Sequence, residues 1–209
     1  MSQEPHPTEI DPNDPDAAYR IGTPPWDVGR PHAELVRVMQ EYRLRPETVL
    51  EVGCGTGADA VWLARRRFEV TAIDSSPIAI ERARLRAEQQ NALLRFVLED
   101  AYEFAHTAGQ FDFVYDAGMY HSVRQKKLER YLDMLWRVTR PGSYYLCLAG
   151  APAEPTENGP AQVAEEDLRN ELGRLFEFIH LRPTRLESSD PNVSYPGWSC
   201  FMRRPPVSL

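Results

Sequence analysis

The stretch TVLEVGCGTGADAVWLARR, residues 48–66, constrains the fold of this chain more than any other part of its sequence. Three glycines, Gly53, Gly55 and Gly57, fall within five positions between an apolar run and a helical pattern. Glycines let the backbone turn sharply and let a ligand approach the main chain, and the N-terminus of the following helix attracts negative or electron-rich groups. The stretch therefore predicts a strand, a tight ligand-binding turn and a helix.

Short apolar runs and helical patterns alternate along the rest of the chain, which is typical of strand-helix-strand units around a mostly parallel sheet. Strands are predicted at residues 49–52, 69–73, 95–98, 111–116, 144–148, 176–180 and 198–203. Helices are predicted within residues 57–67, 77–91, 126–142 and 164–176. The turn-rich segment SSDPNVSYPG before the last strand favours an antiparallel entry. We expect an α/β fold with seven strands.

Length and charge limit the domain organisation and the partners. The chain has 209 residues, of which 42% are hydrophobic, enough for one continuous core. We expect a single domain over residues 19–209 after a mobile N-terminal arm, residues 1–18, which is acidic and proline-rich. The net charge of -7 disfavours a long nucleic-acid duplex as partner. We interpret the basic run Arg65, Arg66 and Arg67 as the solvated end of a helix.

Cysteine and histidine usage gives further expectations. Three widely spaced cysteines, Cys54, Cys147 and Cys200, indicate neither a disulfide framework nor a zinc site and favour a reducing compartment, the cytoplasm. The histidines show no metal-ligand spacing, and no apolar run approaches the roughly 20 residues of a membrane helix. We expect no metal and no membrane partner. The oligomeric state stays open.

The acids around the glycine turn discriminate between ligands. A dinucleotide fingerprint spaces its glycines differently, as GxGxxG, and Glu51 beside a pyrophosphate would be repulsive. Beside a cationic amino group, the same carboxylate is favourable. Asp74 closes the next strand, where a carboxylate can accept both hydroxyls of a ribose, and Asp100 follows the third strand within reach of an adenine amino group. An amine, a ribose and an adenine in this order describe S-adenosylmethionine.

Several motifs extend this pattern over residues 24–152: VLEVGCGTG, VTAIDSSPIAIERAR, FVLEDA, FDFVYDAGMYHSV and LDMLWRVTRPGSYYL. Together they resemble the class I S-adenosylmethionine-dependent methyltransferases. The resemblance implies a Rossmann-like, seven-stranded, mostly parallel sheet with helices on both faces and an antiparallel last strand. It also implies a cofactor site formed by Glu51, Gly53, Cys54, Gly55, Gly57, Asp74, Ser75, Asp100, Ala101 and Asp116. The alternative is a tight connection in which Asp74 caps the next helix together with Ser75 or Ser76.

The upstream stretch TPPWDVGRPHAEL is similar to the entry segment of small-molecule methyltransferases of the thiopurine, thiol and tellurite type. In these enzymes the tryptophan segment closes over the cofactor and helps to form the acceptor pocket. The resemblance therefore adds Trp26 and Arg30 to the predicted cofactor site. The alternative is that Trp26 only covers an edge of the sheet.

The fourth strand ends in YDAGMYHSV, at the position where such folds bring the acceptor to the methyl group. Asp116, Met119, Tyr120 and His121 are the candidate lining, and Asp116, Tyr120 and His121 are the candidate catalytic residues. His121 is the titratable group nearest neutrality, although a histidine at a strand-helix junction can equally satisfy backbone groups. The Asn/Asp-Pro-Pro-Tyr signature is absent, which disfavours methylation of base nitrogens. Alignment can contribute about 7 to 11 kcal/mol and a general base about 10² to 10⁴-fold, so positioning dominates.

The leading hypothesis is therefore methyl transfer from S-adenosylmethionine to a small-molecule thiol, chalcogen or aromatic hydroxyl by in-line displacement, with S-adenosylhomocysteine as the product. Two alternatives remain. The same fold could methylate a nucleic acid or a protein, which predicts a basic rim around the pocket. It could also bind the cofactor without catalysis, because a fold does not fix a function.

Overall fold

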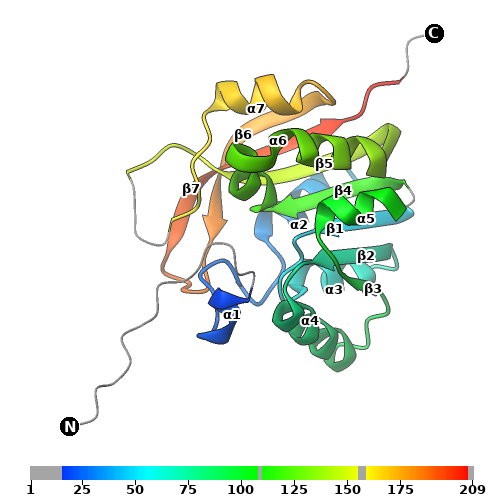
Figure 1. Cartoon of the computed structure of the whole chain (residues 1–209), viewed down its shortest axis with the longest axis vertical. Coiled ribbons are helices and arrows are strands. Elements are labelled where there is room, and N and C mark those ends of the chain that lie inside the picture. The colour runs from blue at the N-terminus through cyan, green and yellow to red at the C-terminus, as the bar shows by residue number, and fades with distance from the viewer. Residues whose placement is uncertain (1–15, 108–109, 155–158, 207–209) are drawn as a thin grey trace.

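Seven strands form one mixed sheet in the computed structural model, which describes residues 16–107, 110–154 and 159–206 (Figure 1). The strands are β1 (Thr48–Val52), β2 (Glu69–Asp74), β3 (Arg95–Leu98), β4 (Phe111–Ala117), β5 (Thr139–Gly150), β6 (Glu177–Glu187) and β7 (Ser194–Arg203). Their order in the sheet is β3-β2-β1-β4-β5-β7-β6. The first five strands are parallel, and β7 is antiparallel to both β5 and β6. The predicted fold class and the antiparallel last strand are confirmed.

Seven helices accompany these strands in the described part of the chain. They are α1 (Ala17–Arg20), α2 (Ala33–Glu41), α3 (Ala58–Ala64), α4 (Pro77–Gln89), α5 (Ala101–Thr107), α6 (Met119–Val138) and α7 (Glu165–Leu172). The predicted helix at residues 126–142 begins earlier, because Gly118 with φ +103° lets the chain enter a helical turn directly after β4. A kink at Lys127 separates this turn from the rest of α6. Pro141 and Gly142 lie in β5, where the pairing register with β4 shifts.

Alternating side chains of the central strands supply two cores, one on each face of the sheet. On one face, Leu50, Val114 and Tyr145 pack against α5, α6 and α7, which lie in front of the sheet in Figure 1. On the other face, Val49 and Phe113 pack against α2, α3 and α4. The sheet is therefore covered by helices on both faces, as predicted.

The carboxyl ends of β1, β2, β4 and β5 lie at the same edge of the sheet because these strands are parallel. Open sheets of this kind bind ligands at that edge. Residues 1–15 of the predicted arm lie outside the described residues, whereas Ala18 is buried and α1 packs against α4. None of the described helices is long and apolar enough to cross a membrane.

Candidate cofactor and acceptor site

The glycine turn after β1 adopts a backbone conformation that L side chains rarely take. Gly53, Gly55 and Gly57 have φ values of +71°, +52° and +75°. A Cβ on Gly57 would lie 2.8 Å from the Cβ of Ala83, so this glycine also allows α3 to pack closely against α4. A Cβ on Gly53 would lie 2.5 Å from Cγ of Met119. The first glycine thus lies under a side chain from the start of α6, and the third serves helix packing.

Asp74 connects the end of β2 to the glycine turn. Its Oδ2 accepts a hydrogen bond from the Gly55 N–H at 2.8 Å, and its Oδ1 accepts one from the Ser76 N–H at 2.9 Å. Burial raises the pKa of Asp74 above its ordinary value, against these backbone hydrogen bonds. Each carboxylate oxygen has two acceptor positions, so both retain capacity for a ligand hydroxyl. Ser75, predicted beside it, is exposed at the same edge.

Ser76 is the residue that caps α4, as one of the alternative interpretations anticipated. Its Oγ accepts a hydrogen bond from Ala79 N–H at 3.0 Å and donates to Asp16. Asp16 also accepts from Ile78 N–H at 3.2 Å. Asp74 therefore supports the turn into α4 but is not the cap itself, because that position belongs to Ser76.

Glu51 is a buried acid whose carboxyl group is only partly hydrogen-bonded. Its side chain is 4% exposed, and Oε2 has no hydrogen-bond partner among the described residues. Burial raises the pKa of Glu51 well above the ordinary carboxyl range, and the neighbouring carboxylates of Asp59 and Asp74 raise it further. An unpaired carboxyl group next to two others is a site for a cation or a hydrogen-bond donor. Within the described residues, no cluster of His, Cys, Asp and Glu could hold a metal ion.

Asp59, in contrast, has a hydrogen-bond partner at each of its carboxylate oxygens. Its two oxygens accept hydrogen bonds from the His32 N–H at 2.8 Å and the Tyr115 hydroxyl at 3.1 Å, and Oδ2 lies 2.7 Å from His32 Nδ1. Burial alone would lower the pKa of His32, but the Asp59 carboxylate outweighs it and raises the pKa. This pair fixes the start of α2 against α3.

An N-terminal segment, residues 19–32, which we call the lid segment, covers the glycine turn. The hydroxyl of Tyr19 lies 3.0 Å from the position that a Cβ on Gly55 would take, and it accepts a hydrogen bond from Trp26 Nε1 at 3.2 Å. Trp26 itself is 56% exposed, and its ring meets that of Tyr19 edge to face. Thr56 of the glycine turn donates to Asp27 at 2.9 Å. The structure thus brings Trp26 to the predicted cofactor side of the sheet.

Two arginines on one face of α4 hold the lid segment. Arg82 donates to the carbonyl oxygens of Tyr19 and Gly22 at 2.7 and 2.9 Å. Arg86 donates to the carbonyl of Gly29 at 2.7 Å and to that of Thr56 at 2.9 Å. The lid segment, the glycine turn and α4 therefore form one connected unit.

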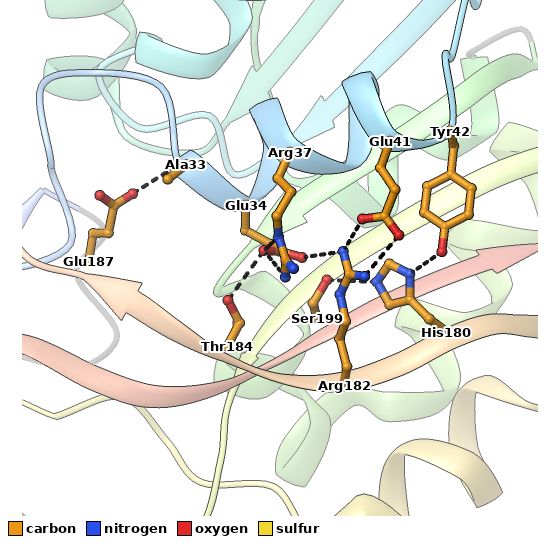
Figure 2. Close-up of polar contacts among 10 residues, drawn as sticks. All are labelled: Ala33, Glu34, Arg37, Glu41, Tyr42, His180, Arg182, Thr184, Glu187 and Ser199. Atoms are coloured by element: carbon orange, nitrogen blue, oxygen red, sulfur yellow. Dashed lines mark hydrogen bonds and ion pairs between the residues drawn. The ribbon is translucent and has the colours of Figure 1, made fainter.

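The far end of the lid segment is fastened to β6. Glu187 accepts a hydrogen bond from the Ala33 N–H at 2.8 Å, where α2 begins (Figure 2), and pairs with Arg30 at 2.5 Å. Ser189 N–H donates to the Pro25 carbonyl at 2.8 Å. Arg30, predicted in the cofactor site, therefore pairs with the last hairpin and not with the glycine turn.

Polar contacts continue along α2 and hold this helix against β6 and β7 (Figure 2). Arg182 of β6 pairs with Glu41 at 2.7 Å and with the buried Glu34 at 3.4 Å. His180 Nδ1 lies 2.8 Å from the Tyr42 hydroxyl, and burial lowers the pKa of this histidine to about 4. The support of the lid segment thus extends to the last two strands.

The adenine-side residues lie next to β2. Glu99 N–H donates to the Asp74 carbonyl at 3.1 Å, which brings Asp100 to the same edge as Asp74. Asp100 Oδ1 accepts from Tyr102 N–H at 2.8 Å and so caps the start of α5. Ala101 is buried and packs in the core. Cys54 is also buried, and burial raises the pKa of its thiol, so its side chain belongs to the packing beneath the turn.

Asp116 and Tyr120 lie in the core, which differs from their predicted contact with cofactor and acceptor. Asp116 is fully buried and accepts hydrogen bonds from the hydroxyls of Tyr131, at 2.6 Å, and Tyr145. Tyr120 is fully buried too, and its hydroxyl donates to Glu171 at 2.6 Å. The apolar surroundings and these protein partners occupy both side chains. Their positions fix β4, α6 and α7 relative to one another.

His121 lies where β4 and β5 end. Its Nδ1 accepts a hydrogen bond from the Gly150 N–H at 3.0 Å, and its Nε2 lies 3.5 Å from the position that a Cβ on Gly118 would take. Burial lowers the pKa of His121 to about 4, so the ring is neutral near pH 7. Because Nδ1 acts as an acceptor, the ring hydrogen is on Nε2. His121 in this arrangement is a hydrogen-bond donor.

Sequence reasoning did not single out several residues that shape this site. Tyr19, Arg82, Arg86 and Glu187 hold the lid segment over the glycine turn. The only signal in the sequence was the spacing of Arg82 and Arg86, which are four residues apart and share one helix face. The partners of Tyr19 and Glu187 are distant in the chain, so no local sequence pattern predicts these contacts.

Comparisons with known proteins agree with this geometry. A family model described as a methyltransferase domain matches residues 49–142. The 2-heptyl-1-hydroxyquinolin-4(1H)-one methyltransferase of Mycobacteroides abscessus is 30% identical over 166 residues, 78% of this chain and 73% of the relative. A probable thiol methyltransferase 2 of Arabidopsis thaliana is 25% identical over 167 residues, 78% of this chain and 74% of the relative. A structure solved for the conversion of a disulfide bond into a thioacetal group during echinomycin biosynthesis has a TM-score of 0.79 and 27% identity, and the match covers 92% of this chain and 91% of that one.

Proposed function

This chain belongs to the class I S-adenosylmethionine-dependent methyltransferases, and on that premise we propose that it methylates a small molecule at a thiol, a chalcogen or an aromatic hydroxyl. The transfer is an in-line displacement that leaves S-adenosylhomocysteine. The observation that supports the cofactor part is the glycine turn with an acid on either side, the buried Glu51 before it and the half-buried Asp74 after it.

The residues around the turn fit the cofactor. The unpartnered Oε2 of Glu51 suits a protonated amino group, since a buried carboxylate next to a cation is stabilised. Asp74 retains acceptor positions for ribose hydroxyls, and Asp100 and Ala101 supply the adenine side. Tyr19 lies over the turn with Trp26 hydrogen-bonded to it, where both would cover the bound cofactor. We assign these residues to cofactor binding.

S-adenosylmethionine supplies a methyl group that its sulfonium already activates. The task of the protein is then to orient the acceptor and to keep its nucleophilic atom in the reactive protonation state. We assign the orienting role to His121, because its Nε2–H can donate a hydrogen bond to an anionic oxygen or sulfur. Asp116 and Tyr120 support it from the core.

This role for His121 narrows the acceptor class. Nε2 carries the ring hydrogen and Nδ1 is engaged by Gly150, so the imidazole does not accept a proton in this arrangement. Acceptors that are already ionised near neutral pH need no base, which favours thiols, chalcogen anions and acidic aromatic hydroxyls. One relative is named for a hydroxyquinolinone and another as a probable thiol methyltransferase, and both acceptor types fall in this class.

A turnover assay tests the proposal. The protein is incubated with S-adenosylmethionine and a panel of thiols, phenols, hydroxyquinolinones, amines and purines, and S-adenosylhomocysteine is measured by mass spectrometry. We expect turnover with acceptors whose acidic group has a pKa near or below the assay pH, and a rate that follows the ionised fraction of the acceptor. Turnover confined to amines or purines would refute the acceptor class, and binding of cofactor without turnover on any acceptor would refute the small-molecule proposal.

A further inference from the structure

A hollow of about 560 Å³ opens on the outer surface of α3 and α4, beside the lid segment. We call it the arginine hollow. Its lining includes Gly29, Arg30, Trp62, Arg65, Arg66 and Arg86. In the described part of the chain no acidic side chain lines it. Four guanidinium groups thus gather at one place on a chain whose net charge is -7.

Only one of the four arginines has a carboxylate partner among the described residues. Arg30 pairs with Glu187 at 2.5 Å. Arg65 contacts the amide oxygen of Gln90 at 3.4 Å, and Arg66 donates to the carbonyl of Trp62 at 3.1 Å. Burial lowers the pKa of Arg66, and the positive charge of Arg65 lowers it further. Three of the four positive charges are therefore not neutralised by a carboxylate among the described residues.

Arg86 is held rigidly by neutral groups. Its Nε and Nη2 donate to the carbonyl and hydroxyl of Thr56 at 2.9 and 3.1 Å, and its Nη1 donates to the Gly29 carbonyl at 2.7 Å. A guanidinium carries five donor hydrogens, so three such bonds leave two available. Because the side chain is already ordered, a further ligand bond costs little additional entropy.

Arg66 is also pre-positioned, by stacking on an aromatic ring. Its guanidinium carbon lies 3.6 Å from the ring centre of Trp62. Stacking engages the face of the guanidinium and leaves donors at its edge free for oxygen atoms. Two of the arginines around the hollow are thus fixed before any ligand arrives.

We propose that the arginine hollow binds a small phosphate-bearing anion. Phosphate oxygens match the forked donors of guanidinium groups, and a doubly charged group gains more than a single carboxylate from several unneutralised cations. A long nucleic-acid strand would extend past the hollow over a surface that is negative on average. The site is separate from the acceptor side of the enzyme, so it does not depend on the proposed acceptor.

Calorimetry with inorganic pyrophosphate as the probe tests this site. The wild-type protein is compared with Arg65→Gln/Arg66→Gln at constant ionic strength. The matched control is Arg130→Gln/Arg137→Gln, which removes two exposed arginines that pair with Glu103 and Asp133 on α5 and α6. We expect the first double variant to bind pyrophosphate at least about tenfold more weakly, and the control to bind within about twofold of wild type.

Binding of S-adenosylhomocysteine by the Arg65→Gln/Arg66→Gln variant verifies that it is folded. Equal pyrophosphate affinity in wild type and this variant would overturn the proposal. An equal loss in the control variant would also overturn it, because net charge alone would then explain the binding. Tighter binding of a short single-stranded oligonucleotide than of pyrophosphate at the same salt concentration would replace the small anion with a nucleic acid.

Discussion

Replacing Glu51 with glutamine should stabilise the protein and, at the same time, lower its affinity for the cofactor. Oε2 of Glu51 is buried and has no partner among the described residues, and Asp59 and Asp74 lie close enough to raise its pKa. A buried unsatisfied polar group costs about 1–3 kcal/mol. The amide removes the like-charge repulsion, so we expect a gain of about 1 kcal/mol in the free energy of unfolding, or about 2–4 °C in Tm.

The gain should grow with pH. An acid whose pKa is raised in the folded state contributes full stability below its unfolded pKa and loses it as the pH rises through the folded pKa. The wild-type protein therefore loses stability through Glu51 as the pH rises above the ordinary carboxyl pKa of about 4.5, whereas Glu51→Gln does not. Glu47→Gln is the matched control, because Glu47 is exposed just before the opposite end of the same strand.

Cofactor affinity, unlike stability, should fall in Glu51→Gln. A hydrogen bond to a charged group contributes about 1.5–3 kcal/mol, so Glu51→Gln should weaken binding of S-adenosylhomocysteine by about 10 to 150-fold. Calorimetry in buffers of different ionisation enthalpy should also detect proton release on binding, because burial holds the pKa of Glu51 well above its ordinary value and the ligand's ammonium group lowers it again. The variant should release none. If the variant is less stable and binds as tightly as wild type, Glu51 is only a structural residue and the reasoning fails.

Three further perturbations test other parts of the site. Gly57→Ala should lower the free energy of unfolding by about 1–3 kcal/mol in denaturant titrations, because of its φ of +75° and the 2.8 Å approach to Ala83; an unchanged midpoint would contradict this. The pKa of His121 is lowered to about 4, so the stability that the neutral ring contributes is lost as the pH falls from about 6.5 towards 4. Over this range the free energy of unfolding should drop by up to about 3 kcal/mol more in wild type than in His121→Gln. Parallel pH profiles of the two proteins would refute this prediction. Glu187→Gln breaks the pair with Arg30, so limited proteolysis should cut the lid segment faster and cofactor affinity should fall about two- to fivefold; equal cleavage rates would show that the lid does not depend on this pair.

The fold was largely readable from the sequence because its central strands are buried on both faces and therefore appear as short apolar runs. All seven predicted strands are present. The short α5 was not predicted, because it follows the third strand without a helical pattern of its own beyond the Asp100 cap. β5 is longer than predicted because a register shift accommodates Pro141 and Gly142.

The site was readable only where local sequence sets the backbone. Asp74 and Asp116 look alike in the sequence, since each is a carboxylate closing an apolar strand. Asp74 meets Gly55, 19 residues away, in a turn whose glycine motif is itself visible in the sequence, whereas Asp116 meets Tyr131 and Tyr145, 15 and 29 residues away, which belong to no such motif. No local pattern separates the two cases. Arg30 illustrates the same limit, because its partner Glu187 is near the other end of the chain.

The placement of β7 between β5 and β6 also orders events during synthesis on the ribosome. In the described sheet β6 pairs with β7 alone, so it has no strand partner until residues up to Arg203 have emerged. Glu187, which closes β6, is the residue that fastens the start of α2 and Arg30. A nascent chain can thus form its glycine turn and the Arg82 and Arg86 contacts to the lid segment early, whereas the contacts made by Glu187 have to wait for β7. A chain truncated shortly before β7 would therefore lack the contacts that fasten the far end of the lid segment to β6.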